Sequence, residues 1–298
     1  MSSERLKIWA GFLAIALIWG STWLAIKIGL EVFPPLLGAA IRFLIASAIL
    51  YAIVRLRRVP IHNGVQARKI YLIMGLFSFG IPYALVYWSE QYLPSSLASI
   101  LFAAYPFWVA LFSHLYLHSE PIDAFKTTGI ILGFLGVIVI FWGHVGTADL
   151  TGTLAVGAMV LCTVLQASVL VFVKKHGQAI SPFVMNFCGM SIGTILLFIM
   201  SLLAESWSAA DWSPKAVGSI LYLAVFGSVV AFVAYYWLLK RVQAVYLSLT
   251  AFINPIIAVI LGALILDETL GTPVAVGAVM VLAGILVANG KSIYQQYA

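Results

Sequence analysis

Long apolar segments dominate this chain, and they constrain its fold more than any other feature. The segment from Ile8 to Leu30, for example, holds a single charged residue, Lys27. A helix needs roughly 20 apolar residues to cross the hydrocarbon of a bilayer, and inside lipid it satisfies its backbone hydrogen bonds internally. Only 9% of the residues are charged, whereas soluble domains normally carry about 25%. The sequence therefore predicts an all-α integral membrane protein.

The apolar segments predict about ten transmembrane helices. Short connections separate them, and many carry a proline at or near the first turn of the next helix, where its missing N–H removes no hydrogen bond. None of the connections is long enough for a soluble domain. The spans are expected at residues 8–30, 34–54, 69–92, 95–117, 123–143, 150–174, 182–203, 215–239, 244–266 and 272–289.

The distribution of Lys and Arg predicts the orientation in the membrane. Most of the 16 Lys and Arg residues fall at span ends on the side of the N-terminus, whereas only Lys215 falls on the other side. Because cytoplasmic connections carry the excess of positive charge, both termini are expected in the cytoplasm. The net charge of +6 is spread over many loop ends and forms no single basic face, so no nucleic-acid partner is expected.

One pattern occurs twice and indicates a duplication. Each copy has a proline within a span, then a glutamate, then two glycines, and the spacing from the glutamate to both glycines is the same in each copy. Other matches extend the repeat over the whole chain. The matching residues are Pro106, Glu120, Gly129 and Gly136 with Pro255, Glu268, Gly277 and Gly284, and Lys27, Pro35, Tyr87 and Trp88 with Lys174, Pro182, Tyr236 and Trp237.

The duplication predicts two repeats, at residues 1–146 (the first half) and 147–298 (the second half). Five spans in each half is an odd number, so the two halves are expected to insert in opposite orientations. Inverted repeats of this kind are typical of secondary transporters, whose binding site lies near the membrane midplane between the repeats. The prediction is thus two inverted five-helix repeats around a central site.

The sequence also resembles a known family. The run Ile18-Trp19-Gly20-Ser21-Thr22-Trp23, Lys27, Pro34-Pro35 and Arg42-Phe43, together with the two Pro–Glu–Gly units, is similar to the EamA family of the drug/metabolite transporter superfamily. The resemblance covers nearly the whole chain and implies a transporter of the inner (plasma) membrane that exports amino acids, other metabolites or drugs. The second half departs from the pattern, since Gln166 stands opposite Trp19 and Gly189 opposite Arg42.

The candidate cavity residues are aromatic or neutral polar. The resemblance implies that their spans surround a central cavity, where aromatic rings can stack on flat ligands and offer a polar tip. Membrane bundles are rich in aromatic residues, so plain packing is the alternative role for each. The candidates are Trp19, Trp23, Tyr83, Tyr87, Tyr105, Gln166, Tyr235, Tyr246 and Asn254.

Two charges and two prolines within spans are further candidates. Arg42 is deep enough to need a partner or a wet cavity, so it is expected either to pair structurally or to bind a substrate carboxylate. Lys27 is nearer its helix end and can extend to the interface. Pro106 and Pro255 are expected to kink their helices. Glu90, at the end of the third span, is expected to face water, and no span is expected to carry a deep carboxylate.

These features predict a secondary transporter rather than an enzyme. The first choice is an exporter of an amino acid or related metabolite that works by alternating access. The alternatives are a multidrug exporter of the same fold, an integral membrane enzyme acting on lipid-linked substrates, and a structural subunit. Cys162 and Cys188 lie in apolar segments and indicate no metal site. We expect no cofactor, a monomer as the simplest assembly, and only a small solute and the lipid bilayer as partners.

Overall fold

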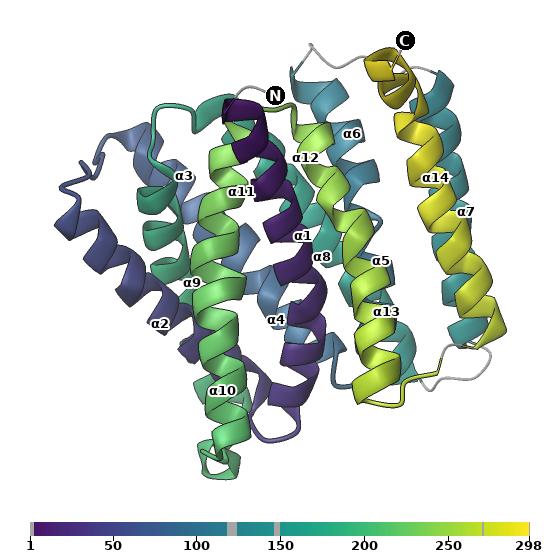
Figure 1. Cartoon of the computed structure of the whole chain (residues 1–298). Helices are drawn as coiled ribbons and strands as arrows, with labels where there is room; N and C mark the ends of the chain where they lie inside the picture. The colour runs from purple at the N-terminus through teal and green to yellow at the C-terminus, as the bar shows by residue number, and fades with distance from the viewer. Residues whose placement is uncertain (1–2, 118–123, 146–149, 270, 298) are drawn as a thin grey trace.

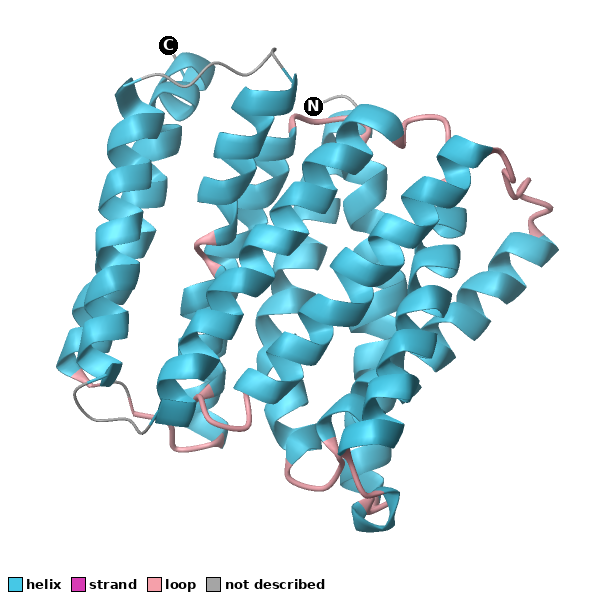
Figure 2. Cartoon of the chain, turned by 180° about the vertical axis from the view of Figure 1, so that it is seen from behind, coloured by secondary structure: helices cyan, strands magenta, loops and turns pink. Residues whose placement is uncertain are grey.

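The computed structural model describes residues 3–117, 124–145, 150–269 and 271–297, and this part of the chain consists of helices and short connections without a strand (Figure 2). The first half contains α1 (Ser3–Leu30), α2 (Pro35–Leu56), α3 (Val65–Met74), η1 (Gly75–Gly80), α4 (Ile81–Ser89), α5 (Ser95–Phe102), α6 (Tyr105–Leu117) and α7 (Ala124–Val145). The second half contains α8 (Leu150–His176), α9 (Pro182–Ala204), η2 (Trp207–Ala209), α10 (Pro214–Tyr222), η3 (Leu223–Val230), α11 (Ala231–Leu239), α12 (Ala244–Ser248), η4 (Leu249–Phe252), α13 (Ile253–Ile265) and α14 (Thr272–Tyr297).

Seven of the described helical stretches are long and apolar enough to cross a membrane. Three shorter apolar helices lie at residues Thr127–Val139, Ile253–Ile265 and Thr272–Gly284. The prolines that open α2, α9 and α10 lie in the first turn, where they remove no helical hydrogen bond. The chain is therefore an all-helical, multi-pass membrane protein.

The ends of the helices define two ends of the bundle. The first turn of α1 and the last turn of α14 lie at one end (Figure 1). The opposite end, called here the distal end, holds the connections α1–α2, α4–α5, α9–α10 and α13–α14 (Figure 1). The last helix of each half, α7 in the first and α14 in the second, lies beside the other at one edge of the bundle in both views (Figures 1 and 2).

The repeated glycines join α7 to α14. A Cβ atom added to Gly136 would lie 2.7 Å from the carbonyl oxygen of Gly277, and one added to Gly284 would lie 2.6 Å from the carbonyl oxygen of Gly129. The two backbones approach closely because no side chain separates them, as is common between membrane helices. The glycines that mark the duplication therefore pack the last helix of one half against the last helix of the other.

The third span of each half contains a π-helical segment. Backbone bonds in η1 and η3 follow the wider π pattern instead of the α pattern. A π segment puts an extra residue into a turn and leaves carbonyl groups displaced from the regular ladder, which is why such segments often occur at functional sites. Neither segment is predicted by the sequence, in which both spans read as regular apolar helices.

The spans that contain the central prolines are interrupted. In the first half, α5 ends at Phe102 and α6 begins at Tyr105, directly before Pro106. In the second half the 3-10 segment η4 precedes α13, which contains Pro255. Each predicted continuous helix is thus two shorter helices, because proline cannot continue the hydrogen-bond ladder of the preceding turn.

Two glutamates of the second half hold helix N-termini of the first half at the distal end. The Glu205 carboxylate accepts hydrogen bonds from the backbone N–H groups of Leu36 (2.7 Å) and Leu37 (2.9 Å). The Glu268 carboxylate accepts bonds from the backbone N–H and the hydroxyl of both Ser95 and Ser96, at 2.6–3.0 Å. These carboxylates satisfy N–H groups that have no partner within their own helices.

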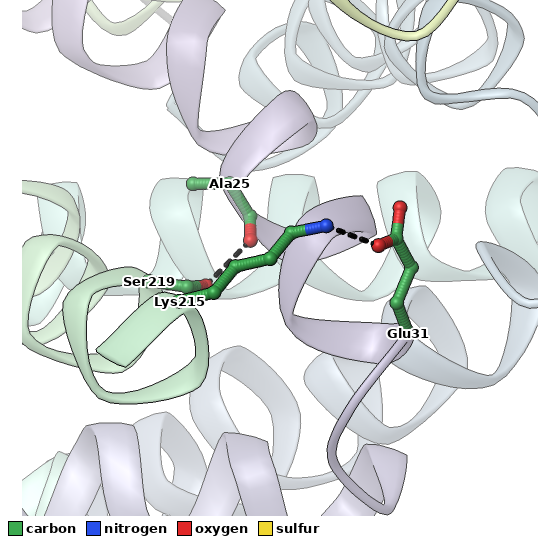
Figure 3. A network of polar contacts seen from close by, with 4 residues as sticks. All are labelled: Ala25, Glu31, Lys215 and Ser219. Carbon is green, nitrogen blue, oxygen red and sulfur yellow. Dashed lines mark hydrogen bonds and ion pairs between the residues drawn. The ribbon is translucent and has the colours of Figure 1, made fainter. Parts of the chain in front are cut away.

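An ion pair at the surface adds a third link between the halves at the distal end. Lys215 of α10 pairs with Glu31, which follows α1, and the hydroxyl of Ser219 donates to the carbonyl oxygen of Ala25 at 2.6 Å (Figure 3). Both charged side chains are about half exposed, so this pair is expected to stabilise the contact by at most about 1 kcal/mol. The partly buried glutamate contacts, with several charge-assisted hydrogen bonds each, are the stronger links.

Candidate substrate cavity

A cavity of about 60 Å³ lies between the two halves. The first half lines it from α1, α2, η1, α4, α5 and α6, and the second half from α8, α11 and α13. Its wall is formed by Trp19, Thr22, Trp23, Ile26, Arg42, Ser78, Tyr83, Val86, Phe102, Tyr105, Gln166, Leu170, Phe232, Tyr235, Tyr236 and Asn254.

Aromatic rings from both halves pack against one another around this cavity. The ring of Trp19 lies 4.9 Å from that of Tyr235, and the hydroxyl groups of Tyr105 and Tyr235 are 2.8 Å apart. The ring of Phe102 stacks on Tyr105 at 5.5 Å, and Trp23 lies 5.4 Å from Phe102. The wall therefore offers flat apolar surfaces with hydroxyl groups at their edges.

Arg42 is the one charged side chain among the described residues that line the cavity. It is 1% exposed, and its Nε atom donates to the hydroxyl of Ser228 at 2.9 Å. Its Nη atoms make longer contacts of 3.4 Å, to the hydroxyl of Tyr87 and the carbonyl oxygen of Gly227. All of these partners are neutral.

No described carboxylate lies within ion-pair distance of Arg42. Its guanidinium lies 4.9 Å from the centre of the Tyr83 ring, close enough for a cation–π contact. A buried charge is usually paired with an opposite charge because desolvation is costly. Neutral groups and an aromatic face stabilise this cation only in part, so the site favours a ligand that carries negative charge.

The π segment η3 presents a backbone acceptor to the cavity wall. The carbonyl oxygen of Gly227 accepts from the indole N–H of Trp19 at 3.2 Å as well as from Arg42. The next residue, Ser228, holds the Nε atom of Arg42. Sequence reasoning missed this anchor, because a π segment has no marker in composition or spacing, and Gly227 alone gave no signal.

The structure places most of the predicted cavity residues around this one cavity. Seven of them line it, namely Trp19, Trp23, Tyr83, Tyr105, Gln166, Tyr235 and Asn254. Tyr87 does not line it, but its hydroxyl contacts Arg42 and its ring borders a smaller cavity between α1, α2 and the second half. The side chain of Tyr246 lies outside the described residues, as does Glu120. Pro106 and Pro255 are buried next to the cavity residues Tyr105 and Asn254.

Asn254 is held by backbone acceptors. With its amide nitrogen turned toward them, it donates to the carbonyl oxygens of Ala16 and Thr250, both at 3.1 Å. This orientation is the one that satisfies the buried amide group. The cavity also contains residues that sequence reasoning left out, chiefly Thr22, Ser78, Phe102, Phe232 and Tyr236. They lie near the predicted residues in sequence, but only the packing of the helices shows which side chains face inward.

Lys27 has a structural partner at a helix end. Its ammonium group donates to the carbonyl oxygens of Glu90 (2.5 Å) and Leu93 (2.9 Å), where α4 ends. Lys174, its counterpart in the second half, donates in the same way to Leu239 (2.5 Å) and Val242 (2.7 Å), where α11 ends. Each lysine thus satisfies carbonyl groups at the negative end of a third span, and Lys27 does not line the cavity.

The prediction that Glu90 faces water is wrong. Its side chain is 0% exposed, and neither carboxyl oxygen has a hydrogen-bond partner among the described residues. The residue follows the last turn of α4, a position that would be at the membrane boundary in an isolated helix. Here the α4–α5 connection is covered by contacts from α1 and from the α13–α14 connection, so the carboxyl group is enclosed.

Comparison with known proteins identifies the family. The model of the EamA-like transporter family matches residues 7–142 and again residues 153–290. The uncharacterized transporter YoaV of Bacillus subtilis (strain 168) is 28% identical over 280 residues, covering 94% of this chain and 95% of that protein. The uncharacterized inner membrane transporter YedA of Escherichia coli (strain K12) is 30% identical over 299 residues, covering 98% and 94%.

One solved crystal structure has the same fold. It superposes with a TM-score of 0.71 at 20% identity, covering 97% of this chain and 99% of the other. The sequence match to the family model in both halves, the curated relatives and the shared fold agree. The chain belongs to the EamA-like transporter family.

Proposed function

We propose that this protein is a secondary transporter of the inner membrane that exports a small carboxylate-bearing metabolite, with amino acids as the first class to test. The observation that carries the proposal is Arg42. It is a buried cation on the wall of the cavity between the halves, and no described carboxylate pairs with it. A substrate carboxylate would supply the missing negative charge through a paired, charge-assisted contact.

The aromatic wall supports a substrate that also has a cationic or apolar part. An α-ammonium group is favoured over the face of an aromatic ring, and the hydroxyl groups of Tyr105 and Tyr235 together with Gln166 add polar contacts. Arg42 would bind the carboxylate end while the rings surround the rest of the molecule. The cavity as it stands is small, so substrate entry would require the halves to separate on one side.

We propose ten spans in two inverted five-helix repeats, with both termini in the cytoplasm and the distal end facing outward. The family match in each half, the paired roles of Lys27 and Lys174 and the paired π segments support two equivalent units. Rocking of these units would open the cavity to one side at a time. The sequence contains no ATP-binding loop, so the energy would come from solute or ion gradients.

Export of cationic drugs by the same fold is the second candidate. The aromatic wall would suit flat cations, but the charge of Arg42 would repel them. The two candidates therefore differ in the sign of charge that the cavity accepts.

The test is transport in proteoliposomes that contain the full chain. Labelled neutral and acidic amino acids, other small carboxylates and cationic dyes would be compared with empty vesicles. We expect a carboxylate to cross, and Arg42→Gln to slow its transport at least about tenfold, as loss of a charged hydrogen bond of ~1.5–3 kcal/mol implies.

A matched control is Arg241→Gln, because Arg241 is an exposed arginine that stacks on Trp237 away from the cavity. This variant should transport like the parent protein. Transport of dyes but not of any carboxylate, or an Arg42→Gln variant as active as the parent, would contradict the proposed substrate class.

A further inference from the structure

The carboxyl group of Glu90 is buried at the distal end without a partner of its own. Its backbone is fully engaged, since its N–H donates to the carbonyl oxygen of Val86 at 2.9 Å and its own carbonyl oxygen accepts from Lys27. Its two side-chain oxygens, in contrast, are enclosed and have no hydrogen-bond donor among the described residues. An ionised carboxylate is strongly disfavoured in such surroundings, so this arrangement suits the neutral acid.

Three charged groups act on Glu90 from the elements around it. Lys27 of α1 and Arg42 of α2 favour its charged form, and Glu268 of the α13–α14 connection opposes it. No charged side chain comes from η1, α5 or α9, or from α8 along residues 150–162. On its own helix, Tyr83 and Tyr87 are the titratable neighbours. Lys27 is already bound to two carbonyl oxygens, and it forms no ion pair with Glu90.

Glu268, whose charge acts on Glu90, is part of a contact between the halves. Burial acts to raise the pKa of Glu268, but the hydrogen bonds from Ser96 and Ser95 outweigh this effect and hold the pKa below its ordinary value. Glu268 therefore stays ionised near neutral pH. An ionised Glu90 would add a second negative charge beside it, within the same contact. The contact of Glu268 with α5 is thus compatible with a neutral Glu90 and is weakened by a charged one.

We propose that Glu90 is a proton-binding site of the outer gate, protonated while Glu268 holds Ser95 and Ser96 and deprotonated when that contact opens. Opening would move the α13–α14 connection away from α5, admit water to the carboxyl group and remove the opposing charge of Glu268. Glu90 would then release its proton to the outer medium, and its carboxylate would pair with the ammonium group of Lys27. This inference rests on the proposed alternation between the halves.

The sign of the pH effect follows from linkage. The closed contact binds one proton more than the open one, so lowering the pH stabilises the closed form and raising the pH stabilises the open form. At pH values between the pKa of the Glu90 carboxyl group in the open form and its pKa in the closed form, the equilibrium constant for opening changes by up to about tenfold per pH unit. The proton is taken up and returned on the same side, so the inference predicts control by outer pH without net proton transport.

Hydrogen–deuterium exchange of the full chain in nanodiscs tests this inference without a substrate. The amide groups of Ser95 and Ser96 donate to Glu268, so their protection, corrected for intrinsic exchange, reports the contact directly. In the parent protein we expect protection to fall as the pH rises from about 5.5 to 8.5. In Glu90→Gln, which mimics the neutral acid, we expect high protection across the whole range.

Three further variants separate the alternatives. Glu31→Gln removes an exposed distal carboxylate and should keep the pH dependence of the parent protein. His144 is the residue before the last one of α7, and histidine is the residue type that ordinarily titrates in this pH range, so His144→Gln tests an alternative proton site and should also keep the pH dependence. Glu90→Asp keeps the carboxyl group, so it should keep the pH dependence and serves as a second test if Glu90→Gln does not fold. The same pH dependence in Glu90→Gln as in the parent, its loss in His144→Gln or Glu90→Asp, or its absence in the parent would overturn the inference.

The exchange result does not depend on the transport assay. If Glu90→Gln removes the pH dependence but no solute crosses in proteoliposomes, the proton site stands and the proposed substrate class fails. If a carboxylate crosses and the exchange is independent of pH, the proposed function stands and the proton site fails.

Discussion

At the scale of single residues, the two halves use some equivalent positions in the same way and others differently. Lys27 and Lys174 have the same role, since each binds two carbonyl oxygens at the end of a third span. Arg42 and Gly189 do not, because Arg42 binds Ser228 and Gly227 of η3 whereas Gly189 lies against the ring of Phe79 in η1. One interface between the halves is therefore polar and the other apolar.

The shared role of the two lysines predicts similar losses of stability. Lys27→Met or Lys174→Met would leave two carbonyl oxygens at a helix end without their charged donor, so we expect each to destabilise the protein by about 1–3 kcal/mol. Thermal unfolding in detergent would show both losses as lower Tm values. Lys69→Met is the matched control, because Lys69 is exposed and no hydrogen bond of its side chain is described, and its change should stay within about 0.5 kcal/mol. A loss in only one of the two lysine variants would contradict an equivalent role.

At the scale of helices, glycine and proline determine which elements meet and where they break. The glycines of α7 and α14 allow backbone contact between the halves. Interruptions precede Pro106 and Pro255 and divide two spans next to the cavity. The π segments η1 and η3 add a second irregularity in each half, and η3 supplies the acceptor for Trp19 and Arg42. The irregular parts of the helices thus lie where the candidate cavity is built.

Close packing of α7 and α14 predicts that one methyl group is harmful there. In Gly284→Ala the new Cβ atom would lie 2.6 Å from the backbone of Gly129 and Gly133, so the helices would have to separate, at a cost of about 1–3 kcal/mol. Gly157→Ala is the control, because a Cβ atom at that helical position meets nothing within 4 Å. We expect a lower Tm only for Gly284→Ala. Equal Tm values for both variants would show that the backbone contact is unimportant.

At the scale of the whole molecule, the halves meet in a cavity and in separate contacts at the distal end. Both halves line the cavity, and Glu205 and Glu268 of the second half hold helix ends of the first. A relative movement of the halves would change the cavity and these contacts together. This arrangement is what allows the state of the distal contacts to control access to the cavity in the proposed mechanism.

The proposed inversion predicts that equivalent connections face opposite sides. In a background with Cys162 and Cys188 replaced by alanine, single cysteines at Glu120 and Thr269 would be labelled with a membrane-impermeant reagent in intact cells. We expect labelling at position 269 and none at position 120 until the cells are opened. Labelling of both positions from outside would contradict the inverted arrangement.

Much of the fold and part of the candidate site followed from the sequence. Apolar length and low charge predicted membrane helices, and spaced motifs predicted the family, which the comparison confirmed. Seven predicted residues line one cavity. They could be chosen because the family resemblance indicated which spans surround a central cavity. Tyr87 lies one turn after Tyr83 in the same regular helix, α4, and its hydroxyl contacts Arg42 although it does not line that cavity. The four-residue spacing puts both tyrosines on one helix face, and only the packing of the helices decides which of them reaches the cavity.

The sequence by itself determined that the chain crosses the membrane repeatedly, and it predicted that its halves are related and that Arg42 is an intramembrane charge. These properties depend on the hydropathy and spacing of residues close together in the chain. Tertiary structure alone decided that Glu90 is enclosed, that Glu268 binds a helix end of the other half, and that the carbonyl oxygen of Gly227 meets Arg42. Burial and hydrogen bonding between distant residues depend on how the helices pack, and local sequence does not encode that packing directly.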